Sequence, residues 1–362
     1  MGRPQRVVRD THSSHGSHTA SRRSELQVVV THSVVTGGAG FLGSHLCERL
    51  LADGHRVTCV DDFSSGALDN LSTFRDSTNF VLLLHDVADA LPVQHRVDEI
   101  YNLACPASPT QYQSDPLRTM RTCVLGAFNV LELAHRTGAR VVQASTSEVY
   151  GDPLVHPQVE TYFGNVMTTS VRACYDEGKR SAETIFADHR RQFGTNVGIA
   201  RIFNTYGPRM KPDDGRVITT FLHQGLLGDP LTVHGSGAQT RSFCYVSDTV
   251  EALVALMRCT AAPGGPINIG NPCEMTMLEL AKAVVALSGP GATIEFLPAR
   301  SDDPRRRCPD ISLACATLGW QPTVSLSEGL LITRSHLIGA LGKSTLASGD
   351  AGRSRPGDPC GS

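Results

Sequence analysis

The chain has 362 residues, of which 40% are hydrophobic and 19% are charged, with a formal net charge of −2. This composition is typical of a soluble globular protein with a buried core. The near-neutral charge gives no electrostatic case for binding to nucleic acid or to an anionic membrane. No run reaches the roughly 18 apolar residues of a membrane span, and the N-terminus lacks a signal peptide's apolar core, so we expect a cytoplasmic location.

Both ends of the chain are expected to be disordered tails. Residues 1–25 are rich in Ser, His, Arg and Thr, and residues 342–362 are rich in Gly, Ser and Pro. Histidines recur at every third position of the first tail, but we expect no metal site there, because an unordered site must also meet the cost of ordering. The eleven cysteines include no C-x-x-C pair, which favours buried apolar side chains in a reducing compartment over disulfides or zinc.

Between the tails, apolar strands alternate with helical patterns. The expected strands are 28–36, 56–61, 80–84, 99–103, 141–145 and 197–203. The expected helices are 41–52, 117–137 and 175–193. This alternation predicts an α/β fold with a Rossmann-type, doubly wound parallel sheet. We expect the sheet domain over 26–203, and a smaller C-terminal substrate-binding lobe over most of 204–341, where Gly and Pro separate shorter elements.

The first expected strand ends in a glycine-rich turn that leads directly into a helix. Gly37, Gly40 and Gly43 have the spacing of short-chain dehydrogenases, and Gly38-x-Gly40-x-x-Gly43 also fits the Rossmann pattern. Glycines allow a tight turn and a close approach of backbone to a pyrophosphate, which the N–H groups of the helix N-terminus then bind. The residues expected to hold the dinucleotide here are Gly37, Gly40, Phe41, Leu42 and Gly43.

Further dinucleotide contacts are expected where the next three strands end. Asp61 ends the second strand and can accept hydrogen bonds from the adenosine ribose. Its charge would repel a 2′-phosphate, which favours NAD over NADP, and its neighbour Asp62 is the less favoured ligand. Asp86 and Val87 follow the third strand and can meet the adenine edge, although Asp86 can equally cap a turn. Leu103, at the end of the fourth strand, is assigned to the same cofactor site.

Candidate catalytic residues follow the fifth strand and begin the next long helix. Tyr175 and Lys179 lie at i and i+4 on one helix face, and the ammonium is expected to lower the pKa of Tyr175. Such a Tyr can take a proton from a sugar hydroxyl while hydride leaves the same carbon. Thr146 can hydrogen-bond the same oxygen, because this end of a parallel strand faces the ligand crevice. Glu148 places a carboxylate nearby, with a purely structural strand-end acid as the alternative.

Several stretches together resemble a known family. They are residues 101–109, 144–153, 174–180, 200–210, 239–246 and 302–311. With the glycine turn and the Tyr-Lys pair, they make residues 28–340 similar to the UDP-glucuronate decarboxylases of the extended short-chain dehydrogenase/reductase family. The resemblance implies bound NAD, a nucleotide-sugar substrate and a homodimer that pairs through helices 117–137 and 174–193.

The activity that the resemblance implies is a redox cycle with no net oxidation. C4 of UDP-glucuronate is oxidised to a ketone, the carboxylate on C5 leaves as CO₂, and hydride returns to C4 to give UDP-xylose, so NAD is regenerated in place. The rivals are a nucleotide-sugar 4,6-dehydratase, a 4-epimerase and a non-catalytic member that binds NAD. The dehydratase branch has an acid where this chain has Ser147, and the epimerase lacks the glutamate found here as Glu148.

The resemblance also assigns roles to single residues. Tyr175 is implied to be the base for the C4 hydroxyl, Lys179 its electrostatic partner and Thr146 a hydrogen-bond partner of the substrate. Glu148 is implied in the decarboxylation stage, and Arg307 is implied to approach the sugar. The residues implied to bind the nucleotide and its diphosphate are Asn204, Arg216 and Arg241.

Three features depart from the family pattern. The segment 167–172 reads Met-Thr-Thr-Ser-Val-Arg where the family usually has Asn-Pro-Ile-Gly-Pro-Arg, and we expect it to shape the wall beside Tyr175. Cys123 stands where the family usually has Asn, and His234 where it usually has Tyr. None of these changes removes an acid, a base or a phosphate ligand, so the sequence still predicts the activity.

Overall fold

The computed structural model describes residues 30–211, 214–259, 264–289, 291–299 and 306–350, with no side chains described for 342–350. The described residues from Thr31 onwards form one compact unit. The histidines of the first expected tail lie outside the described residues. No helix in the described part of the chain is long and apolar enough to cross a membrane.

A seven-stranded parallel sheet forms the centre of this unit, which confirms the expected fold class. Its strands, in spatial order, are β11 (Pro266–Ile269), β6 (Val197–Ile202), β5 (Arg140–Thr146), β4 (Glu99–Asn102), β1 (His32–Thr36), β2 (Arg56–Asp61) and β3 (Phe80–Leu84). All five residues of β1 are buried, as expected for a parallel strand covered on both faces. The strand order reverses between β1 and β4, which is where doubly wound sheets bind ligands.

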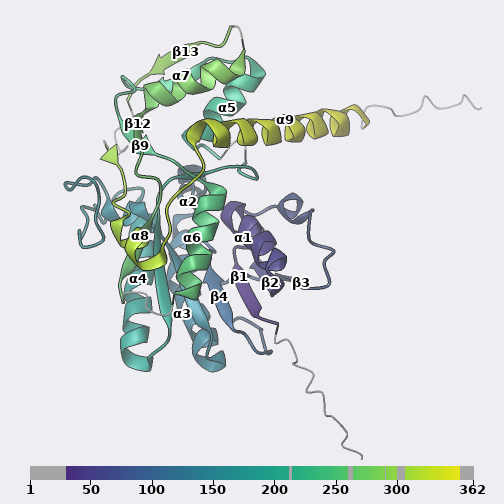
Figure 1. The fold of residues 1–362 in the computed structure, drawn as a ribbon, viewed down its shortest axis with the longest axis vertical. Helices are drawn as coiled ribbons and strands as arrows, with labels where there is room; N and C mark the ends of the chain where they lie inside the picture. The colour runs from purple at the N-terminus through teal and green to yellow at the C-terminus, as the bar shows by residue number, and fades with distance from the viewer. Residues whose placement is uncertain (1–29, 212–213, 260–263, 290, 300–305, 351–362) are drawn as a thin grey trace, which may run out of the picture. The chain divides into compact units, whose positions relative to one another are not determined.

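Helices cover both faces of the sheet (Figure 1). One layer contains α1 (Phe41–Ala52), α6 (Val246–Arg258) and α8 (Ser312–Leu318). The opposite layer contains α2 (Pro109–Ser114), α3 (Pro116–Thr137) and α4 (Ala173–Phe193). Short 3₁₀ turns occur at η1 (Leu68–Leu71) and η2 (Ser147–Tyr150). The second of these directly continues β5, and so it places the residues after Thr146 at the carboxyl edge of the sheet.

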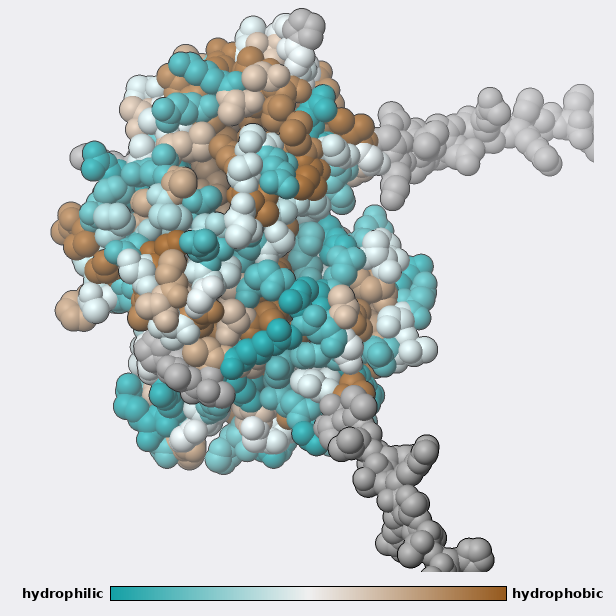
Figure 2. Space-filling model, viewed as in Figure 1, coloured by the Kyte–Doolittle hydropathy of each residue, from teal (hydrophilic) through white to brown (hydrophobic). Residues whose placement is uncertain are grey.

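The remaining elements lie above the carboxyl edge of the sheet in the view of Figure 1. They are α5 (Val217–Leu227), α7 (Met277–Ser288), α9 (Leu326–Asp350), the pair β8 (Leu231–His234) and β13 (Ile294–Leu297), the pair β7 (Thr205–Tyr206) and β10 (Cys244–Tyr245), and the group β9 (Thr240–Ser242), β12 (Glu274–Thr276) and β14 (Arg306–Arg307). Apolar surface gathers over the lobe that carries α5, α7 and α9 (Figure 2). Exposed apolar side chains on α9 are Leu331, Ile332 and Ile338.

Most expected elements agree with the structure to within two residues at each end, but three expected boundaries differ by more. The first strand begins at His32 and not at residue 28. The division after residue 203 cuts across the sheet, because β11 pairs with β6 and α6 packs on β5 and β6. The tail expected from residue 342 is corrected for 342–350, since α9 continues to Asp350 and elongation of a docked helix is favourable. Residues 351–362 lie outside the described residues.

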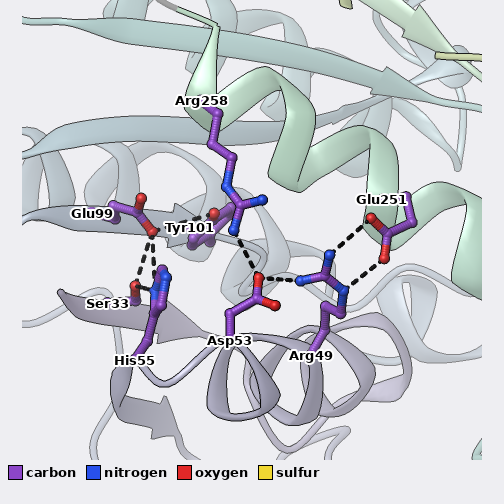
Figure 3. A network of polar contacts seen from close by, with 8 residues as sticks. All are labelled: Ser33, Arg49, Asp53, His55, Glu99, Tyr101, Glu251 and Arg258. Atoms are coloured by element: carbon purple, nitrogen blue, oxygen red, sulfur yellow. Dashed lines mark hydrogen bonds and ion pairs between the residues drawn. The ribbon is translucent and has the colours of Figure 1, made fainter. Parts of the chain in front are cut away.

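A polar network closes the amino edge of the sheet (Figure 3). The hydroxyl of Ser33 in β1 donates to Glu99 of β4 at 2.9 Å and contacts His55, just before β2, at 2.9 Å. Asp53, at the end of α1, accepts from Arg258 at the end of α6 at 2.7 Å. These contacts join both crossover helices and two central strands at one edge, and the opposite edge is left for ligands.

Candidate active site

A cavity of about 600 Å³ opens at the carboxyl edge of the sheet. It is bounded by the residues that follow β1 to β6 and by the lobe above them. All residues that the sequence assigns to the site line this cavity: Gly37, Gly40, Phe41, Leu42, Gly43, Asp61, Asp86, Val87, Leu103, Thr146, Glu148, Tyr175, Lys179, Asn204, Arg216, Arg241 and Arg307. The fold therefore brings together residues from the whole length of the described chain, in a space of the size that cofactor sites have.

The glycine turn has the geometry that pyrophosphate binding needs. Gly37 has φ +68°, and a Cβ there would lie 2.9 Å from the Cα of Ala104. A Cβ on Gly43 would lie 2.0 Å from the carbonyl oxygen of Gly37. No acidic side chain occupies the first turn of α1 and no side chain caps it, so its N–H groups are available to an anion. These residues fit a dinucleotide.

Gly43→Ala is expected to weaken NAD binding by at least about tenfold and to lower the melting temperature, because the new methyl group forces the turn apart. Titration of the protein with NAD and a thermal melt measure the two effects. Gly339→Ala is the matched control, since a Cβ on this α9 glycine meets nothing within 4 Å. Wild-type affinity in Gly43→Ala would contradict the assignment of this turn to the cofactor.

Asp61 is held rigidly at the end of β2. Its carboxylate accepts from the backbone N–H of Ala39 at 2.9 Å and from that of Phe63 at 2.8 Å. Burial raises the pKa of Asp61, while the two backbone donors oppose that rise. Asp62 points its carboxylate to Arg118, whose guanidinium donates at 2.7 Å. This ion pair explains why Asp61 is the better placed of the two for a ribose.

The remaining expected cofactor contacts lie beyond β3 and β4. Asp86 accepts from the N–H of Ala88 at 2.9 Å and therefore caps a turn, although it also lines the cavity. Val87 is buried beside it. The N–H of Leu103 donates to the carbonyl of Thr36 at 3.1 Å, which ties the β4 loop to the glycine turn.

A buried row of polar side chains, which was not predicted from the sequence, crosses the sheet beneath the cavity. Thr36 donates to Asn102 at 2.6 Å, and Asn102 donates to Gln143 at 2.7 Å. Gln143 in turn donates to the carbonyl of Ala144 at 3.0 Å. The sequence does not reveal these pairings, because the partners come from strands that lie far apart in the chain. The row fixes the relative positions of the three strand ends.

Tyr175 and Thr146 meet inside the cavity. The Tyr175 side chain is 6% exposed, both residues line the cavity, and the Thr146 side chain acts to lower the pKa of Tyr175. Lys179 lies over the face of the Tyr175 ring, 5.8 Å from its centroid, and donates to the carbonyl of Ala144 at 2.9 Å. Burial raises the pKa of Tyr175 well above its usual value. The expectation that Lys179 lowers this pKa is therefore wrong for the protein alone, because burial outweighs an ammonium that faces the ring.

A second aromatic ring orients Tyr175. The ring of Tyr112, from α2, is stacked on that of Tyr175 with centroids 5.0 Å apart and an interplanar angle of 5°. Tyr112 is 1% exposed, and its hydroxyl has no hydrogen-bond partner among the described residues. The stack limits rotation of the Tyr175 ring and so supports its contact with Thr146.

Glu148 lies between two guanidinium groups. Arg307, on β14, donates to both of its oxygens, one of them at 3.1 Å, and Arg172 donates at 2.5 Å. Burial alone would raise the pKa of Glu148, but the two arginines lower it to about 2. Glu148 is therefore an anion at neutral pH. The sequence did not predict Arg172 as a partner of Glu148. The carbonyl of Arg172 also accepts from the N–H of Tyr175 at 2.9 Å, in the first turn of α4.

A second buried acid lies beside this cluster. Asp176 is 5% exposed, and its Oδ1 has no hydrogen-bond partner among the described residues. Burial and the charge of Glu148 raise the pKa of Asp176 from 3.8 to about 7. The folded protein therefore binds this proton more tightly than the unfolded chain, and the stability that results is lost as the pH rises towards 7.

Asp176→Asn is expected to raise the melting temperature relative to wild type by a few degrees at about pH 8 and by little at about pH 5. The amide cannot ionise, so the variant avoids a buried charge that wild type acquires. Thermal melts across this range test the difference. The exposed Asp188→Asn should show no such pH-dependent gap, and an equal gap at both pH values for Asp176→Asn would contradict the burial argument.

The expected substrate ligands come from the C-terminal lobe. Arg216 immediately precedes α5 and pairs with Asp214 at 2.8 Å. Arg241, on β9, is 6% exposed and donates to the carbonyl of Thr240 at 2.7 Å. Asn204 follows β6 at the carboxyl edge. All three candidate ligands line the same cavity as the glycine turn.

The departures from the family pattern have different consequences. Residues 167–171 do not line the cavity, so the expectation that they form its wall is wrong, while Arg172 does line it. His234 lines the cavity at the end of β8. Cys123 is buried, with its sulfur 3.3 Å from that of Cys105. The substitutions at residues 167–171 therefore do not change the side chains that line the cavity.

The sequence matches known proteins along most of its length. A family model described as GDP-mannose 4,6 dehydratase matches residues 34–333. UDP-glucuronic acid decarboxylase 2 of Arabidopsis thaliana is 56% identical over 297 residues, which are 82% of this chain and 66% of the relative. UDP-glucuronic acid decarboxylase 6 of the same plant is 54% identical over 82% of this chain and 86% of its own length. UDP-glucuronic acid decarboxylase 1 of Xenopus tropicalis is 52% identical over 82% and 70%.

Solved structures share the fold. UDP-glucuronic acid 4-epimerase from Bacillus cereus, in complex with UDP-glucuronic acid and NAD, has a TM-score of 0.78 at 28% identity and covers 86% of this chain and 100% of its own. UDP-glucose 4-epimerase from Thermotoga maritima, with UDP-glucose, has a TM-score of 0.79 at 29% identity over the same shares. The chain therefore belongs to the extended short-chain dehydrogenase/reductase family, in its branch of UDP-glucuronic acid decarboxylases.

Proposed function

We propose that this protein converts UDP-glucuronate to UDP-xylose and CO₂. The observation that carries the proposal is the meeting of the Glu148–Arg307 pair with Thr146 and Tyr175 in the cavity that also contains the glycine turn. The names of the relatives at 52–56% identity support the same substrate.

NAD is the cofactor, and the chain contributes a fixed cradle for it. The turn from Gly37 to Gly43 and the N-terminus of α1 receive the pyrophosphate, and Asp61 receives the ribose. When bound, NAD supplies a hydride acceptor for C4 of the sugar, a hydride donor at the end of the cycle, and a positive charge that favours the Tyr175 phenolate. Because NAD is regenerated in place, a rigid cradle suits the reaction.

Tyr175 performs the proton transfer at the C4 hydroxyl. Thr146 lines the same cavity and acts to lower the pKa of Tyr175, and the ring is held by the stack on Tyr112. Lys179 donates to the carbonyl of Ala144 and lies over the face of the Tyr175 ring. The same Tyr returns the proton to the oxygen on C4 when the ketone is reduced. Burial excludes water from the reacting atoms, which protects the ketone.

Glu148 and its arginines act at the carboxylate of the sugar. In the 4-keto sugar this carboxylate is β to the ketone, so the electrons of the breaking bond pass into an enolate and CO₂ leaves neutral. Glu148 stays ionised at neutral pH, so the proton that C5 receives, one for each CO₂ released, is supplied by water once CO₂ has left. The charge of Glu148 holds Arg307 and Arg172 at this end of the cavity, and repulsion between the two carboxylates favours loss of the substrate's charge.

Product identity separates this proposal from its rivals. The side chain that would serve as the acid of a 4,6-dehydratase is replaced here by Ser147, which lines the cavity and is too weak an acid near neutral pH. Purified protein is incubated with NAD and either UDP-glucuronate or a nucleotide-linked glucose, and the products are identified by mass spectrometry. We expect UDP-xylose from the first and no dehydration of the second. UDP-galacturonate as the sole product would favour the epimerase instead.

We also propose a homodimer that pairs through α3 and α4. Leu125 and Phe128 are exposed on one face of α3, with 39% and 54% of their surface accessible, and Phe193 is exposed at the end of α4 at 50%. Apolar side chains at i and i+3 are typical of a helix that packs on another helix. The cytoplasmic location expected from the sequence stays a prediction.

Phe128→Arg is expected to convert the dimer to a monomer, because it places a charge at the centre of the apolar face. The measurement is molar mass by light scattering during gel filtration. Leu331→Arg, at an exposed apolar position of α9, is the control and should keep the mass of wild type. A monomeric wild type, or an unchanged mass for Phe128→Arg, would contradict the proposed interface.

A further inference from the structure

Two cysteines lie within reach of each other at the wall of the active site. Cys105 follows β4 and lines the cavity, and Cys123 lies on α3 beneath it. Their sulfur atoms are 3.3 Å apart, and both thiols are free. A disulfide has a sulfur–sulfur distance of about 2.05 Å, so a shift of little more than about 1 Å would join them.

The pair lies directly against α4, the helix that carries Tyr175 and Lys179. A Cβ on Gly178 would lie 3.0 Å from the sulfur of Cys123, so this sulfur packs against the turn of α4 between Tyr175 and Lys179. Cys105 belongs to the loop after β4, and Ala104 of this loop packs against Gly37 of the glycine turn. A structural change at Cys105 and Cys123 is therefore expected to affect both the catalytic side chains on α4 and the glycine turn.

The surroundings of the pair favour reaction with an oxidant. The hydrogen bond from Cys105 and the ammonium of Lys179 lower the pKa of Cys123 against the effect of burial. The same hydrogen bond and burial raise the pKa of Cys105 well above its usual value, so the thiolate character falls on Cys123, whose sulfur lies 3.3 Å from that of Cys105. Cys105 lines the cavity, which gives a small oxidant a path to it. Thiolate character and access are the two requirements for a redox-sensitive cysteine.

We propose that Cys105 and Cys123 form a reversible disulfide that switches off the active site, with hydrogen peroxide as the oxidant. One thiolate attacks the peroxide, an S–O bond forms, the O–O bond breaks, and hydroxide leaves. The second thiolate attacks the resulting sulfenic acid, the S–S bond forms, the S–O bond breaks, and hydroxide leaves again. The thiol protons neutralise both hydroxides, so two thiols and one peroxide give one disulfide and two waters.

Formation of this bond is expected to displace the loop that carries Cys105 and Ala104. Because the loop contacts Gly37, its displacement is expected to distort the glycine turn. The displacement also moves the sulfur of Cys105 away from Tyr175. Displacements of about 1 Å in an active site can lower turnover about a hundredfold. We therefore expect the oxidised protein to lose at least about tenfold of its activity, with full recovery after reduction by dithiothreitol.

A second pair offers an internal comparison. The sulfurs of Cys47 and Cys59 lie beneath the glycine turn, at 3.2 and 2.6 Å from the position that a Cβ on Gly38 would take. Both are completely buried, and neither lines the cavity. Peroxide has no path to these two thiols, so we expect them to stay reduced at peroxide concentrations that oxidise Cys105 and Cys123.

The test treats the reduced full-length protein with hydrogen peroxide and blocks the remaining thiols with an alkylating reagent. Mass spectrometry of peptides locates any disulfide, and two functions are followed: CO₂ release from UDP-glucuronate and binding of NAD. We expect a Cys105–Cys123 link, a parallel loss of both functions, and recovery with dithiothreitol. NAD binding keeps the test valid if UDP-glucuronate proves not to be the substrate.

Variants assign the effect to this pair, each compared with its own reduced form. Cys123→Asn, with Cys123→Ser as a second choice if the first fails to fold, is expected to keep its function under peroxide. Cys315→Ser removes an exposed thiol and should remain as sensitive as wild type. Loss of function without the mapped link, the link without loss of function, or full sensitivity in both Cys123 variants would overturn the proposal.

Discussion

Tyr175→Phe is expected to lower the rate of CO₂ release by about 10²–10⁴-fold while NAD and UDP still bind. The change removes the Tyr175 hydroxyl from the lining of the cavity and keeps the ring stacked on Tyr112. Without it the C4 hydroxyl has no base, so the ketone that allows CO₂ to leave does not form. The measurement is a single-turnover assay of CO₂ release, together with titrations of both ligands.

Tyr112→Phe is the matched control for this prediction. It also removes a phenol oxygen from the stacked pair, but this oxygen has no hydrogen-bond partner among the described residues, so its loss is expected to cost little. If Tyr175→Phe retained most of the wild-type rate, the assignment of the base would be wrong. If Tyr112→Phe were equally inactive, the ring stack and not the Tyr175 hydroxyl would be the essential feature.

Glu148→Gln is expected to lower CO₂ release about a hundredfold and to destabilise the protein by about 3–5 kcal/mol. The amide removes the charge that compensates two guanidinium groups, of which Arg307 is 4% exposed. NAD binding should persist, since the glycine turn and Asp61 are untouched. The measurements are CO₂ release, NAD affinity and unfolding by denaturant.

Glu177→Gln controls for the loss of a carboxylate on the neighbouring helix. Glu177 pairs with Arg180 at 3.6 Å in a partly exposed position, and such pairs contribute about 0–1 kcal/mol. We expect this variant to match wild type in both assays. Full activity in Glu148→Gln with a loss of stability alone would assign Glu148 to the fold and not to the reaction, which was the alternative left open by the sequence.

The sequence predicted the sheet, and the candidate site residues that it singles out line one cavity, because both depend on local patterns. The helix at Phe41–Ala52 and the strand at Arg56–Asp61 have the bounds expected for them, since Gly and Asp mark their ends. The strand ends of a parallel sheet share one edge, so residues such as Asp61, Thr146 and Asn204 are brought together by topology alone. The match to a family supplied what patterns do not, above all Arg307.

Contacts between distant segments could not be predicted in this way. The sequence shows Arg172 only as the end of an altered loop, whereas its role as a partner of Glu148 depends on how α4 packs against η2. The pKa of Tyr175 was predicted to fall because Lys179 lies one turn away, but burial depends on the whole cavity. Cys105 and Cys123 likewise become a pair only when α3 packs beneath the β4 loop.

The most direct test of the central claim uses UDP-glucuronate that carries deuterium on C4. Purified wild-type protein is incubated with this substrate and an excess of unlabelled NAD, and the product is analysed by mass spectrometry. Because hydride is removed from C4 and returned in the same cavity, we predict UDP-xylose that retains the deuterium, with one CO₂ for each product. Formation of product without deuterium, or of a UDP-sugar that keeps its carboxylate, would contradict this account.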